Sequence, residues 1–306
     1  MSSTAAQAPI QSFHASLVEH GLIISTGVRG GYGRSALFED ILERFDALVM
    51  RCGSEEHAEQ MTFPPIVARE LIERMGYLGS FPQLIGSIHS FFGTDAVAHD
   101  MASRASTGQR WEGALDPTEV MLAPAACYPV YPLFSGLLPE GGRTVTVKGW
   151  CYRHEPSDEP TRLQAFRMRE FIRAGSPDVV EAWRDDWLRR AMGMLEKLGL
   201  PVHSDLANDP FFGRTGRMLA NNQREQRLKF EIMVPIISAE QPTAICSFNW
   251  HQEHFSGKFN IRRQSGGSAH TACLGFGLER VVLALLKIHG MDPGNWPNDV
   301  RAQLWI

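Results

Sequence analysis

The feature of this sequence that most restricts its fold is a pair of strand-like segments in the middle of the chain. Residues 144–152 carry β-branched and aromatic side chains, and residues 162–172 follow after a short loop of prolyl and charged residues. Further strand-like segments come later, at 228–237, 243–250 and 258–263. Strands that pair through hairpin-length loops, with helices after them, favour an α+β fold with a mostly antiparallel sheet flanked by helices.

Helical periodicity surrounds this strand-rich region. Apolar side chains recur at helical spacing over 36–52 and over 178–198, which predicts two amphipathic helices. We also expect a helix over 66–75 that ends at Gly76, and an apolar helix over 268–289. The strict strand–helix alternation of a doubly wound fold is missing from this pattern.

The domain organisation predicted from the sequence is simple. The first residues are small and polar, so residues 1–12 are expected to be flexible and poorly ordered. No repeat of fixed period and no long linker divides the rest of the chain. We therefore expect residues 13–306 to form a single domain.

Composition excludes several classes of protein. Thirty basic against 34 acidic residues give a formal net charge of −4, which excludes nucleic-acid binding by bulk charge alone. No apolar run reaches the roughly 18 residues of a membrane span, and the N-terminus has no secretory signal pattern. Five cysteines without paired spacing argue against a disulfide scaffold. We expect a cytoplasmic protein with no membrane partner.

Two candidate sites lie on the predicted hairpin. Arg153 and Glu155 are two residues apart at a strand end, so both side chains point the same way. They form either a clamp for a phosphate or a solvated Arg–Glu pair on the surface. Strand alternation also places Arg162, Phe166 and Glu170 on one face of the next strand. Phe166 suits either a platform for a purine or an ordinary core position.

A third candidate site is the segment 275–280, which reads Gly-Phe-Gly-Leu-Glu-Arg and precedes an apolar run. Small residues at the start of a helix allow a ligand to approach closely, and a buried Arg280 is costly unless it meets an anion. The alternative is a pair of packing glycines and a surface arginine. No GxGxxG or GxxxxGK[ST] motif is present, so any nucleotide must bind by another device.

In this order, the three segments resemble the second and third signature motifs of class II aminoacyl-tRNA synthetases. Phe63-Pro64-Pro65 resembles the first motif, the one that forms dimers, so the resemblance implies a homodimer. Within the class, residues 162–170 and 243–249 are most similar to the seryl enzymes. The sequence shows no N-terminal coiled-coil arm and no anticodon-binding domain, and in this it resembles the amino acid:[carrier protein] ligases, which are similar to the archaeal-type seryl core.

That resemblance implies an activity. These ligases use ATP to activate a small amino acid as aminoacyl-adenylate and load it onto the phosphopantetheine thiol of a carrier protein. We expect glycine as the preferred substrate and alanine second, with Trp250 and His251 as walls of the pocket. The alternatives are a synthetase core that charges tRNA, although we expect no tRNA partner, and a non-catalytic paralogue that senses amino acids.

The resemblance also implies one catalytic Zn²⁺ per subunit, held by Cys127, Glu170 and Cys273. Two thiolates and a carboxylate leave a fourth position open, as catalytic zinc sites do. That position suits the amino group of the substrate. Taken alone, each buried cysteine would be read as a small hydrophobe.

The same resemblance implies the residues that bind ATP. Arg153 is expected to hold the α-phosphate and the amino-acid carboxylate, and Arg280 to cover the base or meet the γ-phosphate. The other expected ATP-binding residues are Glu155, Arg162, Leu163, Phe166, Lys229, Ala244, Ile245, Cys246 and Ser247.

Mg²⁺ is expected to bind with ATP. The seryl enzymes place a metal-binding glutamate where this chain has Ala244, so Glu231 or Ser247 is the alternative ligand. Because carrier proteins are generally acidic, the docking surface is expected to be locally basic. The candidates are Arg214, Arg217, Arg224, Arg227 and Lys229.

Overall fold

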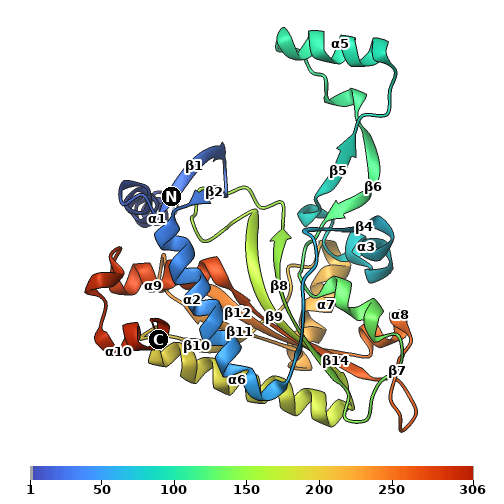
Figure 1. Ribbon diagram of the computed structural model, residues 1–306, viewed down its shortest axis with the longest axis vertical. Helices are drawn as coiled ribbons and strands as arrows, with labels where there is room; N and C mark the ends of the chain where they lie inside the picture. Colours follow the sequence, from blue (N-terminus) through green and yellow to red (C-terminus); the bar gives the residue numbers. More distant parts are fainter. Residues whose placement is uncertain (1–2, 306) are drawn as a thin grey trace.

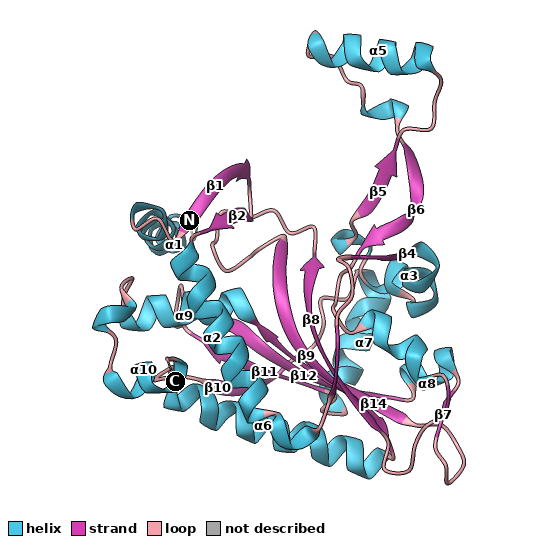
Figure 2. Ribbon diagram, viewed as in Figure 1, coloured by secondary structure: helices cyan, strands magenta, loops and turns pink. Residues whose placement is uncertain are grey.

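A seven-stranded sheet forms the centre of the protein, whose computed structural model describes residues 3–305 (Figures 1 and 2). The strand order is β10-β11-β12-β14-β9-β8-β3, and every neighbouring pair is antiparallel except β3 with β8. The strands are β3 (Glu59–Met61), β8 (Arg143–Tyr152), β9 (Ala165–Gly175), β10 (His203–Leu206), β11 (Lys229–Val234), β12 (Thr243–Gln252) and β14 (His270–Gly277). The predicted α+β fold with a mostly antiparallel sheet is confirmed.

The helices α2 (Ala36–Cys52), α6 (Pro177–Lys197) and α9 (Leu278–His289) cover one face of this sheet (Figure 1). The helices α1 (Ser3–Glu19) and α10 (Asn298–Leu304) pack into the same core cluster as these three. Apolar side chains of these helices pack with Phe171, Phe248 and Phe276 of the sheet in the largest core cluster. The periodicity over 36–52 correctly predicted α2, whose first turn is capped by Ser35 accepting from the Phe38 N–H.

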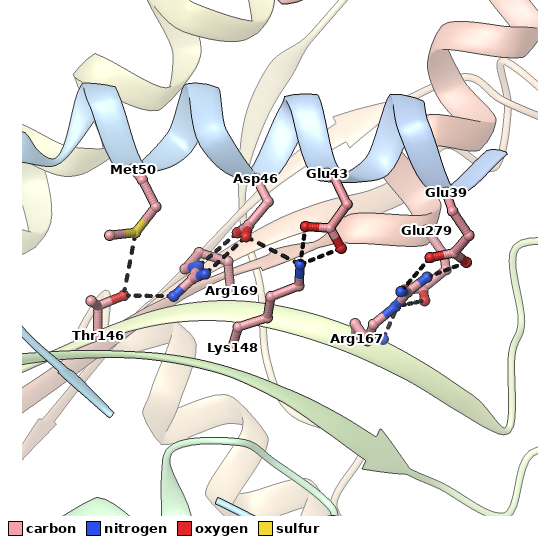
Figure 3. A network of polar contacts seen from close by, with 9 residues as sticks. All are labelled: Glu39, Glu43, Asp46, Met50, Thr146, Lys148, Arg167, Arg169 and Glu279. Carbon is pink, nitrogen blue, oxygen red and sulfur yellow. Dashed lines mark hydrogen bonds and ion pairs between the residues drawn. The ribbon is translucent and has the colours of Figure 1, made fainter. Parts of the chain in front are cut away.

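Ion pairs fix α2 to the sheet (Figure 3). Asp46 binds the guanidinium of Arg169 through two hydrogen bonds of 2.6 and 2.8 Å, and Glu39 binds Arg167 in the same way at 2.6 and 2.7 Å. Both arginines belong to β9 and point toward α2. Because side chains alternate along a strand, Glu170, the residue after Arg169, points to the opposite face.

A smaller three-stranded sheet and a projecting arm lie beside the main sheet (Figure 1). The small sheet contains β4 (Ile66–Ala68), β5 (Ser87–Ser90) and β6 (Asp116–Leu122), and α5 (Asp95–Ser106) lies beyond the β5–β6 end. Helix α5 has no buried residue.

The remaining elements are short or lie at the edges. The helices are α3 (Arg69–Met75), α4 (Tyr77–Ser80), α7 (Gly213–Glu225) and α8 (His254–Phe259), and the strands are β1 (Ile23–Val28), β2 (Gly31–Arg34), β7 (Gly136–Leu137) and β13 (Ile261–Arg262). The 3₁₀ helices are η1 (Ser54–Glu56), η2 (Pro82–Leu84), η3 (Glu112–Ala114), η4 (Tyr128–Phe134) and η5 (Pro293–Asn295).

Several sequence predictions need correction. Residues 268–289, predicted as one helix, contain strand β14 followed by helix α9. The prediction was wrong because both halves are uniformly apolar, so no change of periodicity marks the boundary between them. The segment 258–263, predicted as one strand, contains the last two residues of α8 and the two-residue strand β13, and the helix predicted over 66–75 begins only at Arg69. Its predicted end at Gly76 is confirmed by that residue's left-handed φ of 77°.

The predicted break after residue 12 coincides with no boundary of secondary structure. Helix α1 runs through it from Ser3, so residues 3–12 are helical, whereas residues 1–2 of the expected flexible segment lie outside the described part. The single domain over 13–306 stays a prediction. Within residues 3–305, none of the helices has the length and apolar character needed to cross a membrane.

Candidate active site

A cleft opens on the face of the sheet that faces away from α2 and α6. It consists of a cavity of about 360 Å³ and an adjoining cavity of about 150 Å³. Both are bordered by Arg153, Met168, Asp209, Ser247, Asn249 and Gly275. A larger residue at Gly275 would crowd the floor of the cleft, because a Cβ there would lie 2.6 Å from the terminal methyl of Met168.

Three potential metal ligands meet at the floor of the larger cavity. Cys127 precedes η4, Glu170 is on β9 and Cys273 is on β14, yet their ligand atoms all lie within 4.8 Å of one another. All three residues are buried. The Ala126 N–H donates to Glu170 Oε1 at 3.0 Å, which ties the Cys127 loop to β9. The structure therefore brings together the three residues that the resemblance named as metal ligands.

The electrostatics of this cluster suit a cation. Burial raises the pKa of Glu170 to about 7, with the neighbouring Cys273 adding to the effect. A hydrogen bond between the two sulfurs raises the pKa of Cys127 and lowers that of Cys273. Two sulfurs and a carboxylate oxygen, buried together, form a donor set that suits Zn²⁺, and a cation would offset the cost of burying their charge.

Arg153 lies where the two cavities meet. Its Nε donates to the Pro124 carbonyl at 3.2 Å, and its guanidinium carbon lies 5.6 Å from the centre of the Phe166 ring. Glu155 and Leu163 also border the smaller cavity. Arg162 borders neither cavity, and its guanidinium lies 3.7 Å from a carboxylate oxygen of Glu155. This ion pair differs from the Arg153–Glu155 pair that the sequence offered as an alternative.

The far wall of the smaller cavity contains Arg280 and Lys229. Arg280 donates to the carbonyls of Thr161 and Ala244, both at 2.9 Å. Lys229 is buried between Asp209 and Glu231, with N–O distances of 2.6 and 2.9 Å. Lys229 is thus neither an exposed strand lysine nor part of a basic surface, and that part of the predicted docking set is wrong.

The strand segment 244–247 borders the same cavity, as the resemblance implied. Ser247 faces the cleft together with Asn249. The side chains of Ile245 and Cys246 are also members of the largest core cluster, so the segment serves packing as well as the cavity.

Several residues of the cleft were missed in the sequence. Asp209, which holds Lys229, comes from a loop without strand or helix periodicity, and Tyr131 comes from the proline-containing helix η4. Asn249 donates to Cys273 Sγ at 3.6 Å. Its period-two spacing from Ser247 and His251 on β12 was the available signal.

Comparison with known proteins agrees with this geometry. Residues 114–289 match the family model "tRNA synthetase class II core domain (G, H, P, S and T)". Over 282 residues, the chain is 44% identical to amino acid–[acyl-carrier-protein] ligase 1 and 45% identical to ligase 2 of Bradyrhizobium diazoefficiens. These alignments cover 92% of this chain and 86% and 84% of the two ligases. The chain belongs to the amino acid–[acyl-carrier-protein] ligase family.

More distant relatives confirm the fold of this ligase-family protein. It is 28% identical to the type-2 serine–tRNA ligase of Methanopyrus kandleri, over 88% of this chain and 55% of that protein. The structure of M. kandleri seryl-tRNA synthetase bound to A. aeolicus tRNASec superposes with a TM-score of 0.79 at 24% identity, covering 95% of this chain and 59% of that one. The chain thus spans just over half the length of these relatives and shares their class II core fold.

Proposed function

We propose that this enzyme activates a small amino acid with ATP and transfers it to the phosphopantetheine thiol of a carrier protein. The observation that carries the proposal is the convergence of Cys127, Glu170 and Cys273 beside a cleft bordered by Arg153 and Arg280. The names of the two 44–45% identical ligases support the choice of a carrier protein as acceptor.

In the proposed first step, a carboxylate oxygen of the amino acid attacks the α-phosphorus of ATP. A phosphorus–oxygen bond forms to give aminoacyl-adenylate, and the bond to the β-phosphate breaks to release pyrophosphate. Alignment and neutralisation of charge are the main tasks of the protein. Arg153 is suited to both, because its guanidinium lies where the two cavities meet.

The smaller cavity is proposed to hold the nucleotide. Phe166 offers an apolar face, and Glu155 with the backbone near Leu163 offers polar groups for the adenine edge. Arg280 is held by two carbonyls with its guanidinium at the cavity wall, where it would cover the base or meet the γ-phosphate.

Lys229 is proposed to contact a phosphate while it remains paired with carboxylates. Glu231 is the better candidate of the two proposed Mg²⁺ ligands, because its carboxylate borders the nucleotide cavity and Ser247 offers only a hydroxyl. Bound Mg²⁺ would offset negative charge on the phosphates.

The larger cavity is proposed to hold the amino acid near the three metal ligands. Bound zinc would supply a Lewis-acid position for the neutral amino group, with Cys127, Glu170 and Cys273 as its protein ligands. Tyr131 and Phe255 stack at 4.0 Å, and His251 lies edge-on to Phe255 at 4.7 Å, so aromatic rings close one side of the site. Such a wall favours glycine, with alanine second.

In the proposed second step, the pantetheine thiolate attacks the adenylate carbonyl carbon. The thioester bond forms, the acyl–phosphate bond breaks and AMP leaves. A cavity of about 360 Å³ is larger than glycine requires, and we take the part lined by Phe81, Phe211 and the exposed Leu219 as its outer part. We propose that this outer part admits the pantetheine arm.

Carrier docking is proposed for helix α7, which borders the mouth of that outer part. Arg214 and Arg217 are exposed on α7 and would meet an acidic carrier. Arg224 already donates to Asn208, and Arg227 lies over the Phe230 ring, so they are weaker candidates. Reversal of Arg214 and Arg217 to glutamate should slow transfer to the carrier and leave adenylation unchanged; unchanged transfer would remove this surface.

The deciding experiment is amino-acid-dependent exchange of pyrophosphate into ATP, measured across the twenty amino acids with and without chelator. Exchange with glycine above alanine is expected. The absence of exchange with every amino acid would refute the enzyme and favour a sensing paralogue. Preferential charging of tRNA, offered in parallel with a phosphopantetheinylated carrier, would favour the synthetase core instead. Light scattering tests the proposed homodimer.

Metal analysis tests the proposed zinc site. Cys273→Ser should lose zinc, because it removes one of two thiolate ligands. Cys52→Ser is the matched control, because Cys52 lies outside the cluster and should keep one zinc per subunit. Full occupancy in Cys273→Ser would overturn the ligand assignment.

A further inference from the structure

A β-bulge directs His251 toward the metal-ligand cluster. Strands β12 and β14 pair regularly from Cys246 to Trp250, but the register shifts before Gln252, which adopts a left-handed φ of 52°. Bulges of this kind re-aim a side chain next to an active site. As a result, His251 lies against both Thr271 and Cys273 of the neighbouring strand.

Both ring nitrogens of His251 have a polar neighbour on β14, and two aromatic rings pack against the imidazole. Its Nδ1 is 3.2 Å from Thr271 Oγ1, and its Nε2 is 3.5 Å from Cys273 Sγ. Tyr131 and Phe255 pack edge-on against the imidazole, with ring centres at 5.8 and 4.7 Å. Two polar neighbours and two aromatic rings therefore hold the imidazole in orientation, and one of its two nitrogens lies next to a potential metal ligand.

The identity of the neighbours decides which nitrogen carries the proton. A sulfur that ligates a metal is a thiolate and accepts hydrogen bonds, so a bare Nε2 lone pair facing it would be repelled. With the proton on Nε2, the ring donates to Cys273 Sγ and its Nδ1 accepts from the Thr271 hydroxyl. Asn249 supplies a second N–H donor to the same sulfur at 3.6 Å.

We propose that His251 is a positioning residue that orients the Cys273 sulfur for metal binding by donating a hydrogen bond to it. This inference rests on the proposed zinc site. Outer groups of this kind fix the geometry of a ligand, and their loss typically weakens metal binding by about 10- to 100-fold. His251 thus does more than form a wall of the amino-acid pocket.

Three variants of the full-length chain test the role of His251. His251→Leu removes the donor, whereas His251→Gln restores an N–H group close to the position of Nε2. His254→Leu is the matched control, because His254 lines the same cavity without belonging to the ligand cluster. Zinc affinity is measured by competition with a chromophoric chelator, and the Co²⁺-substituted proteins are compared by their sulfur-to-cobalt charge-transfer absorption. Thermal unfolding of the metal-free proteins verifies folding.

We expect His251→Leu to bind zinc about 10- to 100-fold more weakly than the wild type and to show a shifted charge-transfer band. His251→Gln and His254→Leu should stay within about 3-fold of the wild type, well below that loss. Wild-type affinity in His251→Leu, or equal loss in His251→Gln, would overturn the role of the donor. Failure of the wild type to bind zinc would instead refute the zinc site itself, and this inference with it.

Discussion

Removal of Asp46 should destabilise the protein far more than removal of another acidic residue on the same helix. Asp46 and Arg169 form a two-point ion pair in which the side chains are only 9% and 3% exposed (Figure 3). Lys148 also approaches the Asp46 carboxylate at 3.3 Å. Asp46→Ala therefore leaves a guanidinium buried without its main partner.

The size of the effect follows from burial. Breaking a buried pair by removing one partner costs about 3–5 kcal/mol, because the remaining charge stays desolvated. Asp40→Ala provides the control, since its pair with Arg44 on the same helix is 44% and 34% exposed and contributes about 0–1 kcal/mol. Both changes replace aspartate by alanine inside α2, so the gain in helix propensity cancels from the comparison.

Urea unfolding followed by tryptophan fluorescence measures the difference in the free energy of unfolding. A third variant, Asp46→Leu with Arg169→Met, removes both charges and should recover most of the loss. If Asp46→Ala lowered the free energy of unfolding no more than Asp40→Ala does, the Asp46–Arg169 pair would contribute only as much as an exposed surface pair. The argument from burial would then be wrong.

Three further outcomes are expected. Burial acts to raise the pKa of Asp46, but its ion pairs outweigh burial and lower it, and hydrogen bonds from Arg167 lower the pKa of Glu39. The stability that these carboxylates provide should therefore be complete above about pH 5 and be lost as the pH falls through their folded pKa values. Unfolding measured over a series of acidic pH values tests this. Gly53→Ala places a Cβ 2.6 Å from an aromatic ring of β9 and should cost about 1–3 kcal/mol, whereas Gly79→Ala meets nothing within 4 Å; equal urea midpoints would contradict this. Arg153→Lys should reduce pyrophosphate exchange about 100-fold or more, and a rate within about 3-fold of wild type would remove its proposed role.

Elements with a clear period could be predicted from the sequence, and those without one could not. Helix α2 follows directly from its apolar spacing and its Ser35 cap. Strand β14 and helix α9 were merged because residues 270–286 are almost all buried and apolar, which removes the contrast between faces. Helix α7 was missed because its sequence is mostly polar and its large apolar residues Met218 and Leu219 are exposed.

The candidate site shows the same division between local and distant information. Arg153 and Glu155 lie close in the sequence, and alternation alone pointed them to one cleft. No spacing rule joins Cys127 to Cys273, because their meeting depends on how β14 pairs with β9 and on the hydrogen bond from Ala126 to Glu170. Resemblance to a family supplied those ligands. The contact between His251 and Cys273 depends on a β-bulge that could not be predicted from the sequence.

Strand β9 joins the stability of the fold to the candidate site, because its two faces carry different groups. Arg169 points to α2 and its neighbour Glu170 points to the cleft. The ion pair with Asp46 therefore fixes β9 on the face that packs against α2, and the hydrogen bond from the Ala126 N–H fixes Glu170 on the face that borders the cleft. Loss of Asp46 should then lower the free energy of unfolding while folded molecules keep the affinity of the proposed zinc site, because the ion pair and the Glu170 carboxylate lie on opposite faces of β9.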